Sequence, residues 1–291
     1  MSLTDDQPSQ PARQLPGPSR LGASSTLLAR VLPMPLPSAR RASLLVERNL
    51  LVYRRGWLLI LSGFFEPLFY LLSIGIGIGA LVGTVVTDSG VALDYTVFVA
   101  PALMASSAMN GAVYDSTFNI FFKLKYAKLY DAVLATPLSA SDVAAGETTW
   151  ALMRGALYST TFLGVMLALG LVQSWWAILA VPACILIGFA FAAVGLAATS
   201  FMKSWQNFEF VQLAVLPMFL FSTTFYPLSV YPDALQVLVQ CTPLYHGIEL
   251  IRALVTGMMD LSILGHVLYL AVMGAIGLAV GSKRLATLLL K

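Results

Sequence analysis

The stretch WWAILAVPACILIGFAFAAVGLAATSF, residues 175–201, is the clearest structural signal in the chain, because it contains no charged side chain. A helix needs about 20 apolar residues to cross the hydrocarbon core of a bilayer, and this stretch is long enough. We therefore predict a membrane-spanning helix from Trp175 to Phe201.

The chain around this stretch is apolar as a whole: 58% of its 291 residues are hydrophobic, 11% are charged, and the mean hydropathy is +0.81. Ordinary soluble domains carry about 25% charged residues, so water is not the main solvent of this chain. Further apolar runs predict an all-α integral membrane protein with six transmembrane helices, at residues 57–82, 95–118, 143–169, 175–201, 210–226 and 263–281.

Lysine and arginine residues lie at the ends of these spans and fall on one side of the membrane: Arg40, Arg41, Arg48, Arg54, Arg55, Lys123, Lys125, Lys128, Lys203, Lys283, Arg284 and Lys291. Cytoplasmic loops are rich in such cations, so we predict a multi-pass protein of the plasma or inner membrane with both termini in the cytoplasm. These cations do not form a patch interleaved with exposed aromatics. We therefore expect membrane lipids, and no nucleic acid, as partners.

The segments outside the spans divide the chain further. Residues 1–38 are rich in Pro, Ser and Gln, which predicts a disordered cytoplasmic tail before a membrane domain at 39–291. Residues 40–55 are amphipathic and predict an interfacial helix on the inner membrane surface. Residues 227–260 are of mixed polarity and broken by prolines, which favours a re-entrant external segment before the last span.

Four stretches carry a resemblance to a known family: EPLFYLLSIGIGIGALVG (66–83), LYDAVLATPLSASDVAAGE (129–147), GFAFAAVGLAATSFMKSWQNFEFVQ (188–212) with LPMFLFSTTFYPLSVYP (216–232), and PLYHGIELIRALVTG (243–257). In this order they resemble the ABC-2 type permeases, and among them the nodulation-factor and lipo-oligosaccharide exporter branch. The resemblance runs from about residue 44 to 284. One departure is Ser222-Thr223, where the family usually has Ser-Gly, and it predicts a stiffer kink there.

The resemblance implies a separate ABC ATP-binding subunit and a second permease copy, in a homodimer or a heterodimer. The chain itself has no G-x-x-x-x-G-K-[ST] sequence, so we expect no cofactor in this chain, with ATP and Mg²⁺ bound by the ATPase. By the same resemblance, a cytosolic coupling helix at 121–133 contacts the ATPase through Phe121, Phe122, Lys125, Tyr126, Lys128 and Tyr130. The alternative is an ordinary interfacial helix with lysines that reach toward water.

Other residues suggest how the helices are held together. Gly75, Gly79 and Gly83 share one helix face, which favours close helix packing over mere tolerance of glycine. Charges inside a membrane are costly, and Glu66, Arg154 and Glu147 are therefore expected to tie helices together more than to bind substrate. Glu66 and Arg154 lie in parallel spans at depths that allow contact, and Glu147 is expected to pair with a lysine.

Aromatic residues define a candidate substrate path, formed by Phe65, Phe69, Phe221, Phe225 and Tyr226, since sugar faces stack on aromatic rings. Packing and lipid contact are the plainer alternatives. We predict no metal site, because His246 and His266 have no ligand partners at metal-binding spacing. No catalytic residues are expected either, since no G-x-S-x-G sequence occurs.

The sequence thus predicts a non-catalytic permease subunit of an ATP-driven exporter. Its cargo is expected to be amphiphilic: a lipo-oligosaccharide, a lipid-linked glycan or a hydrophobic drug. Two alternatives stay open, an ion-coupled secondary transporter that uses Glu66 and Arg154, and an intramembrane enzyme.

Overall fold

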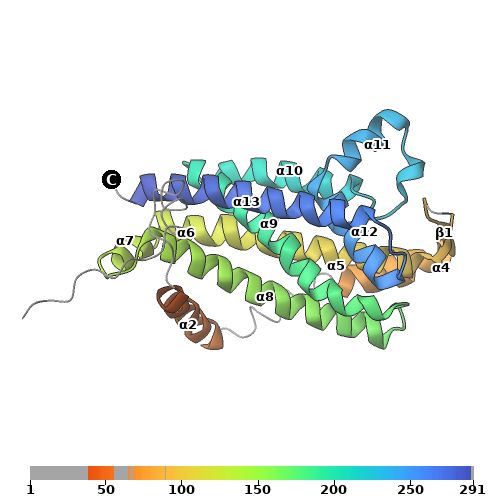
Figure 1. Ribbon diagram of the computed structural model, residues 1–291, viewed down its shortest axis with the longest axis horizontal. Helices are drawn as coiled ribbons and strands as arrows, with labels where there is room; N and C mark the ends of the chain where they lie inside the picture. Colours follow the sequence, from red (N-terminus) through yellow and green to blue (C-terminus); the bar gives the residue numbers. More distant parts are fainter. Residues whose placement is uncertain (1–38, 56–64, 66–67, 89, 290–291) are drawn as a thin grey trace, which may run out of the picture. The chain divides into compact units, whose positions relative to one another are not determined.

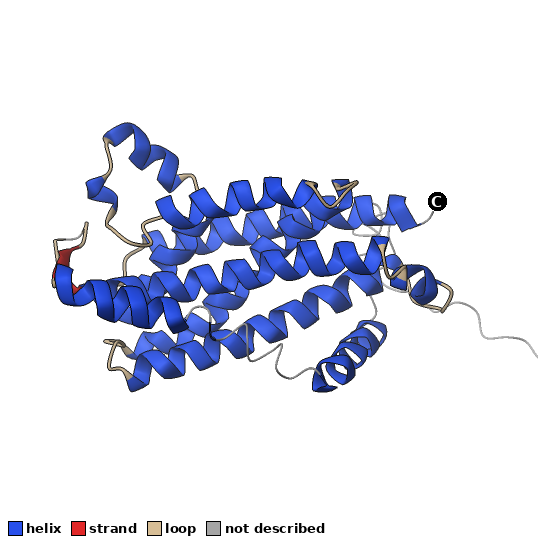
Figure 2. Ribbon diagram, turned by 180° about the vertical axis from the view of Figure 1, so that it is seen from behind, coloured by secondary structure: helices blue, strands red, loops and turns tan. Residues whose placement is uncertain are grey.

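The computed structural model describes residues 39–55, 65, 68–88 and 90–289. Figure 2 shows that helices make up nearly all of this part of the chain, with two short strands. The predicted tail at 1–38 lies outside the described residues. The elements are α2 (Ala39–Arg55), η1 (Leu71–Ile78), α4 (Gly79–Val82), β1 (Thr84–Val86), β2 (Ala92–Asp94), α5 (Tyr95–Tyr114), η2 (Asp115–Asn119), α6 (Ile120–Lys125), α7 (Leu129–Leu134), α8 (Ala140–Ala168), η3 (Trp175–Leu179), α9 (Ala180–Phe201), α10 (Asn207–Phe221), η4 (Leu228–Val230), α11 (Asp233–Gln240), α12 (Pro243–Thr256) and α13 (Ser262–Leu289).

Four helical stretches in the described residues are long and apolar enough to cross a membrane: Tyr95–Lys125, Ser141–Ala168, Trp175–Phe201 and Ser262–Arg284. They match the second, third, fourth and sixth predicted spans. Two shorter apolar helices, Leu68–Val82 and Asn207–Phe221, fall at the first and fifth. The helical membrane fold is therefore confirmed. The count of six spans stays a prediction, because much of the first span lies outside the described residues.

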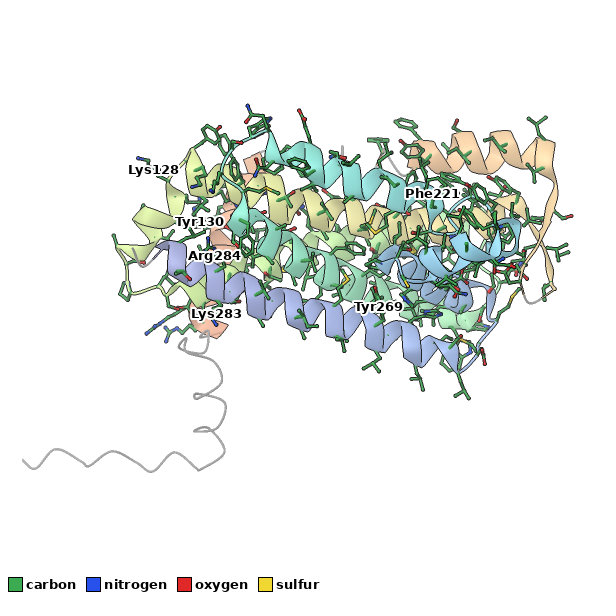
Figure 3. All side chains as sticks on the ribbon, turned by 90° about the horizontal axis from the view of Figure 1, so that it is seen from above. Lys128, Tyr130, Phe221, Tyr269, Lys283 and Arg284 are labelled. Atoms are coloured by element: carbon green, nitrogen blue, oxygen red, sulfur yellow. The ribbon has the colours of Figure 1, made fainter. Side chains whose placement is uncertain are left out.

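The long helices end in two groups of short elements (Figure 1). One group holds α6 and α7, beside the last turns of α13, and we call this the inner end. The other holds β1, α11 and α12, and we call it the outer end. The labelled cations Lys128, Lys283 and Arg284 lie together at the inner end in Figure 3. The clustering of cations that the sequence predicted is thus present in the folded chain.

Helices α9 and α13 approach each other most closely, through glycines on α13. A Cβ atom on Gly277 would lie 2.7 Å from the backbone nitrogen of Val194, and one on Gly281 would lie 3.1 Å from that of Ala197. Small residues permit such backbone contact between membrane helices. The spacing of Gly274, Gly277 and Gly281 carried this signal, which the sequence analysis missed.

The glycines that the sequence did single out divide into two kinds. A Cβ on Gly75 or Gly79 would lie 3.1 Å and 2.8 Å, respectively, from side-chain atoms of Thr96 on α5, and the Thr96 hydroxyl donates to the Gly75 carbonyl at 2.6 Å. Gly83 has open space around its Cβ position and a φ of +73°. Gly83 therefore allows the turn after α4, where left-handed backbone favours glycine.

Helix α2 matches the amphipathic segment that the sequence predicted, and it packs along α8. Leu45 and Asn49 are buried on one face, whereas Leu44 and Leu51 are exposed. Exposed leucines beside the exposed Arg40 suit a membrane surface. The location of α2 at such a surface stays a prediction.

The segment from Pro227 to Asp260 folds as η4, α11 and α12, with prolines directly before η4 and α11 and at the first residue of α12. Helix α12 packs on α5, α13 and α9. A β-hairpin that the sequence did not predict lies nearby, with Val85 paired to Leu93. The hairpin turn contacts η4, since Asp88 accepts the backbone N–H of Ser229 at 3.0 Å. Whether this segment enters a bilayer stays a prediction.

Candidate functional site

The predicted coupling helix at 121–133 is two short helices rather than one. Helix α6 ends at Lys125 and α7 begins at Leu129, with Lys128 between them at a φ of 45°. A left-handed residue breaks the helical hydrogen-bond ladder, so the two helices are separate here. Helix α8 then starts with Ser139 as its N-cap, where Ser139 and Asp142 form a reciprocal capping box. We call Ile120–Leu134 the coupling segment.

The six residues predicted for ATPase contact divide between two faces of this segment. Phe121 and Tyr130 are buried at 1% exposure each, and so face this chain's own core. Phe122, Lys125, Tyr126 and Lys128 are exposed. The rings of Phe122 and Tyr126 are 54% and 61% exposed and stack on each other with centroids 5.7 Å apart. The exposed face is therefore an aromatic pair flanked by two cations.

The buried face of the coupling segment belongs to an inner aromatic cluster of Phe118, Phe121, Trp205 and Phe208. The Phe208 ring stacks on Phe118 at 4.0 Å and meets Phe121 edge-on at 5.1 Å. Trp205 packs edge-on against Phe208 at 5.1 Å. Such ring pairs each contribute on the order of 1 kcal/mol beyond area burial. The cluster joins the coupling segment to the start of α10, and the sequence analysis missed Trp205 and Phe208.

Arg154 forms a buried ion pair with Asp115 of the π-helical turn η2. Its guanidinium also donates to the Tyr53 hydroxyl on α2 at 3.0 Å. Glu66, which the sequence analysis considered as a partner of Arg154, lies outside the described residues. Asp115 was missed because it is a lone acid inside an otherwise apolar span. The contacts tie α2, η2 and α8 together at the inner end.

Glu147 is another buried carboxylate at the inner end. The lysine expected beside it is Lys123 of α6, whose Nζ lies 2.7 Å from Glu147 Oε2. Asn49 of α2 donates to the same oxygen at 3.4 Å. Burial, followed by the nearby Glu147 carboxylate, raises the pKa of Tyr130 well above its ordinary value, so this phenol stays neutral. Glu147 thus ties the coupling segment to α2 and α8.

The residues of the candidate substrate path form two groups. Phe65 and Phe69 stack with centroids 5.7 Å apart and are exposed. Phe221 is also exposed, and Tyr226 packs on Tyr231 at 5.1 Å. Tyr70 and Phe219 join the two groups, with centroids 6.2 Å apart. The structure therefore places exposed aromatics on neighbouring elements, the first-span helix and α10.

A polar cluster at the outer end surrounds the turn after α10. Thr223, where the resemblance predicts a glycine, has a φ of 57°, in the left-handed region. Its hydroxyl donates to Glu249 at 3.0 Å, and its carbonyl accepts from Arg252 at 2.7 Å. Arg252 also pairs with Glu249 and lies 4.0 Å from the Phe98 ring centroid. We call Thr223, Glu249 and Arg252 the outer clamp.

His246 and His266, which the sequence treats as separate outer residues, contact each other. Their Nδ1 atoms lie 2.7 Å apart, and Tyr269 stacks on His246 at 3.9 Å. Among the residues that the structure describes, no group of three or more His, Cys, Asp or Glu side chains could hold a metal ion. The pair therefore joins α12 to α13. A separation of twenty positions along the chain concealed it from the sequence analysis.

These features define a polytopic helical membrane protein with buried ion pairs and an exposed aromatic pair at its inner end. Residues 40–256 match the ABC-2 type transporter family, and the chain belongs to this family. Nodulation protein J of Rhizobium leguminosarum bv. trifolii is 34% identical over 224 residues, which cover 76% of this chain and 83% of that protein. Nodulation protein J of Rhizobium meliloti (strain 1021) is 32% identical over 214 residues, covering 72% and 79%.

Proposed function

We propose that this chain is the transmembrane subunit of an ABC exporter, driven by a separate ATPase that docks on the coupling segment. The observation that carries the proposal is the exposed Phe122 and Tyr126 pair, flanked by Lys125 and Lys128, on a short helix at the cation-rich end. Exposed large aromatics beside cations are typical anchors of a protein interface. Membership of the ABC-2 type transporter family supports an ABC ATPase as the partner.

The proposal includes the orientation and assembly of the subunit. The inner end faces the cytoplasm by the positive-inside rule, which puts both termini there in an inner or plasma membrane. Two permease copies form the pathway, with two ATPases beneath them. ATP binding closes the ATPases, moves both coupling segments and opens a route between the permeases.

The proposed cargo is an amphiphile such as a lipo-oligosaccharide, a lipid-linked glycan or a hydrophobic drug. Two observations support it: the sequence resemblance to lipo-oligosaccharide exporters, and the exposed rings of Phe69 and Phe221 on neighbouring elements. The buried charges at the inner end give less support to an ion pathway. Asp115 and Glu147 each have a basic partner, which suits a tie between helices better than an ion site.

The test is reconstitution of the chain in vesicles with the ABC ATPase that copurifies with it. We expect Phe122→Ala and Tyr126→Ala each to weaken ATPase binding by about 2 kcal/mol, and Lys125→Gln by less than about 1 kcal/mol, because buried anchors carry most interface energy. ATPase stimulation and export should fall together, while the ATPase alone keeps its basal turnover. If both aromatic variants bind the ATPase and export like the wild type, the docking proposal is wrong.

A further inference from the structure

Helix α10 packs differently from the other apolar helices. All of its residues are described, and only Phe208 is buried. A stripe of half-buried residues, Val211, Val215, Met218 and Phe219, follows Phe208 along one face. The opposite face is open, with Phe210 and Leu213 exposed by 71% and 70%. The helix is therefore held firmly at its ends and loosely along its length.

The inner attachment of α10 is made by η2 together with the coupling segment. Phe208 is enclosed by Phe118 and Phe121, with ring centroids at 4.0 Å and 5.1 Å. Phe121 is followed directly by Phe122, the exposed residue of the proposed ATPase contact. The short helix α6 thus carries Phe122, of the proposed ATPase contact, on one side and Phe121, one of the two rings that enclose Phe208, on the other. A displacement of α6 would therefore reach α10 mainly through Phe208, with Val211 packed against the same cluster.

The outer attachment of α10 is polar. The residues after the helix, Ser222, Thr223 and Thr224, are all buried. The hydroxyls of Ser222 and Thr242 share one hydrogen bond at 2.8 Å. Thr223 is hydrogen-bonded to Glu249 and Arg252. A β-branched residue in the left-handed region costs on the order of 1–3 kcal/mol, which these contacts must offset. The turn is therefore a fixed joint to α12.

We propose that α10 transmits the movement of the coupling segment to the outer segment at 227–260, with Phe208 as the positioning residue at the inner joint and Arg252 at the outer joint. The inference rests on the proposed function. Pro217 removes one backbone hydrogen bond inside α10, but the helix continues from Asn207 to Phe221. With tight ends and a loosely packed middle, we expect it to move as one unit. Neither residue needs to touch the ATPase or the cargo.

The experiment is hydrogen exchange with mass spectrometry on the reconstituted complex, with and without ATP plus vanadate. In the wild type, we expect nucleotide to alter the rate of hydrogen exchange both in the coupling segment and in residues 228–240. Phe208→Ala should keep the first change and lose the second. Phe210→Ala is the matched control on the same helix, because its ring is exposed, and it should keep both.

Measurements of export and of ATPase binding distinguish a loss of transmission through α10 from a simple loss of structure. Phe208→Ala should lower export about tenfold or more, within the usual range of coupling between sites, while nucleotide-dependent ATPase binding is kept. If Phe208→Ala fails to assemble, Phe208→Leu and Arg252→Lys test the two joints with smaller changes, and both should reduce the outer response. A merely structural role would reduce ATPase binding and export together.

The outcomes distinguish the two proposals. Absence of any nucleotide effect on the coupling segment of the wild type would overturn the proposed function, and this inference with it. Two results would overturn the inference alone, provided that nucleotide changes hydrogen exchange in the coupling segment. The first is no change at residues 228–240 in the wild type. The second is a change at residues 228–240 that persists in Phe208→Ala.

Discussion

Helices α13 and α10 are both apolar, yet they are held in opposite ways. α13 contacts α9 along its length through Gly274, Gly277 and Gly281, with backbones in direct contact. α10 is fixed at its ends by Phe208 and by the outer clamp, and between them only a stripe of half-buried residues packs on the core. Contact along the whole length resists sliding and rotation, whereas contact at the ends permits a rigid displacement. In the inference proposed above, α9 and α13 are accordingly the frame against which α10 moves.

The largest expected effect comes from breaking an end attachment. Arg252→Gln leaves Glu249 and the Thr223 carbonyl without their cation. Losing one partner of a fully buried ion pair costs about 3–5 kcal/mol, and because the Glu249 side chain is 26% exposed we expect the lower end of this range. Thermal unfolding of the detergent-purified chain should shift accordingly. Because the clamp is an end joint, Arg252→Lys should recover part of the loss. An unchanged midpoint for Arg252→Gln would mean that the clamp does not hold α10.

A smaller effect is expected from adding a methyl group at the close contact between α9 and α13. Gly277→Ala places a methyl group 2.7 Å from Val194 nitrogen and should destabilise the chain by about 1–3 kcal/mol through overpacking. Gly265, on the same helix, has open space at its Cβ position. Gly265→Ala should be neutral or stabilising by up to about 1 kcal/mol, because alanine favours helix. Equal unfolding midpoints for the two variants would remove the case for a close α9 and α13 contact.

The smallest effect is expected at the open middle of α10. Leu213→Ala removes a side chain that is 70% exposed in the single chain, so stability should change by less than about 0.5 kcal/mol. Unfolding of the monomeric, detergent-purified chain measures this. A large loss would show that α10 packs along its length as α13 does, and the contrast between the two helices would disappear.

The sequence predicted the spans better than the contacts between them. The charge-free run at 175–201 becomes η3 and α9 with the predicted bounds, and the predicted amphipathic segment at 40–55 becomes α2. Apolar length and helical periodicity are properties of one segment, so they can be derived from it.

The missed features all depend on the rotation of one helix against another. Asp115 meets Arg154, His246 meets His266, and Phe208 enters the cluster at Phe121, although each pair is far apart in the chain. Tertiary packing selects these partners, and a single sequence does not report the facing surfaces. The coupling residues were chosen by resemblance, and only the structure divides them into the exposed Phe122 face and the buried Phe121 face.

The most direct test of a moving α10 against a fixed frame is thiol labelling in the reconstituted complex. Single cysteines at Leu213 on α10 and at Ile276 on α13, in a background lacking Cys184 and Cys241, both start from exposed positions. We predict that ATP plus vanadate changes the labelling rate of Leu213→Cys and leaves that of Ile276→Cys unchanged. A nucleotide effect at Ile276 with none at Leu213, or equal effects at both, would contradict the account.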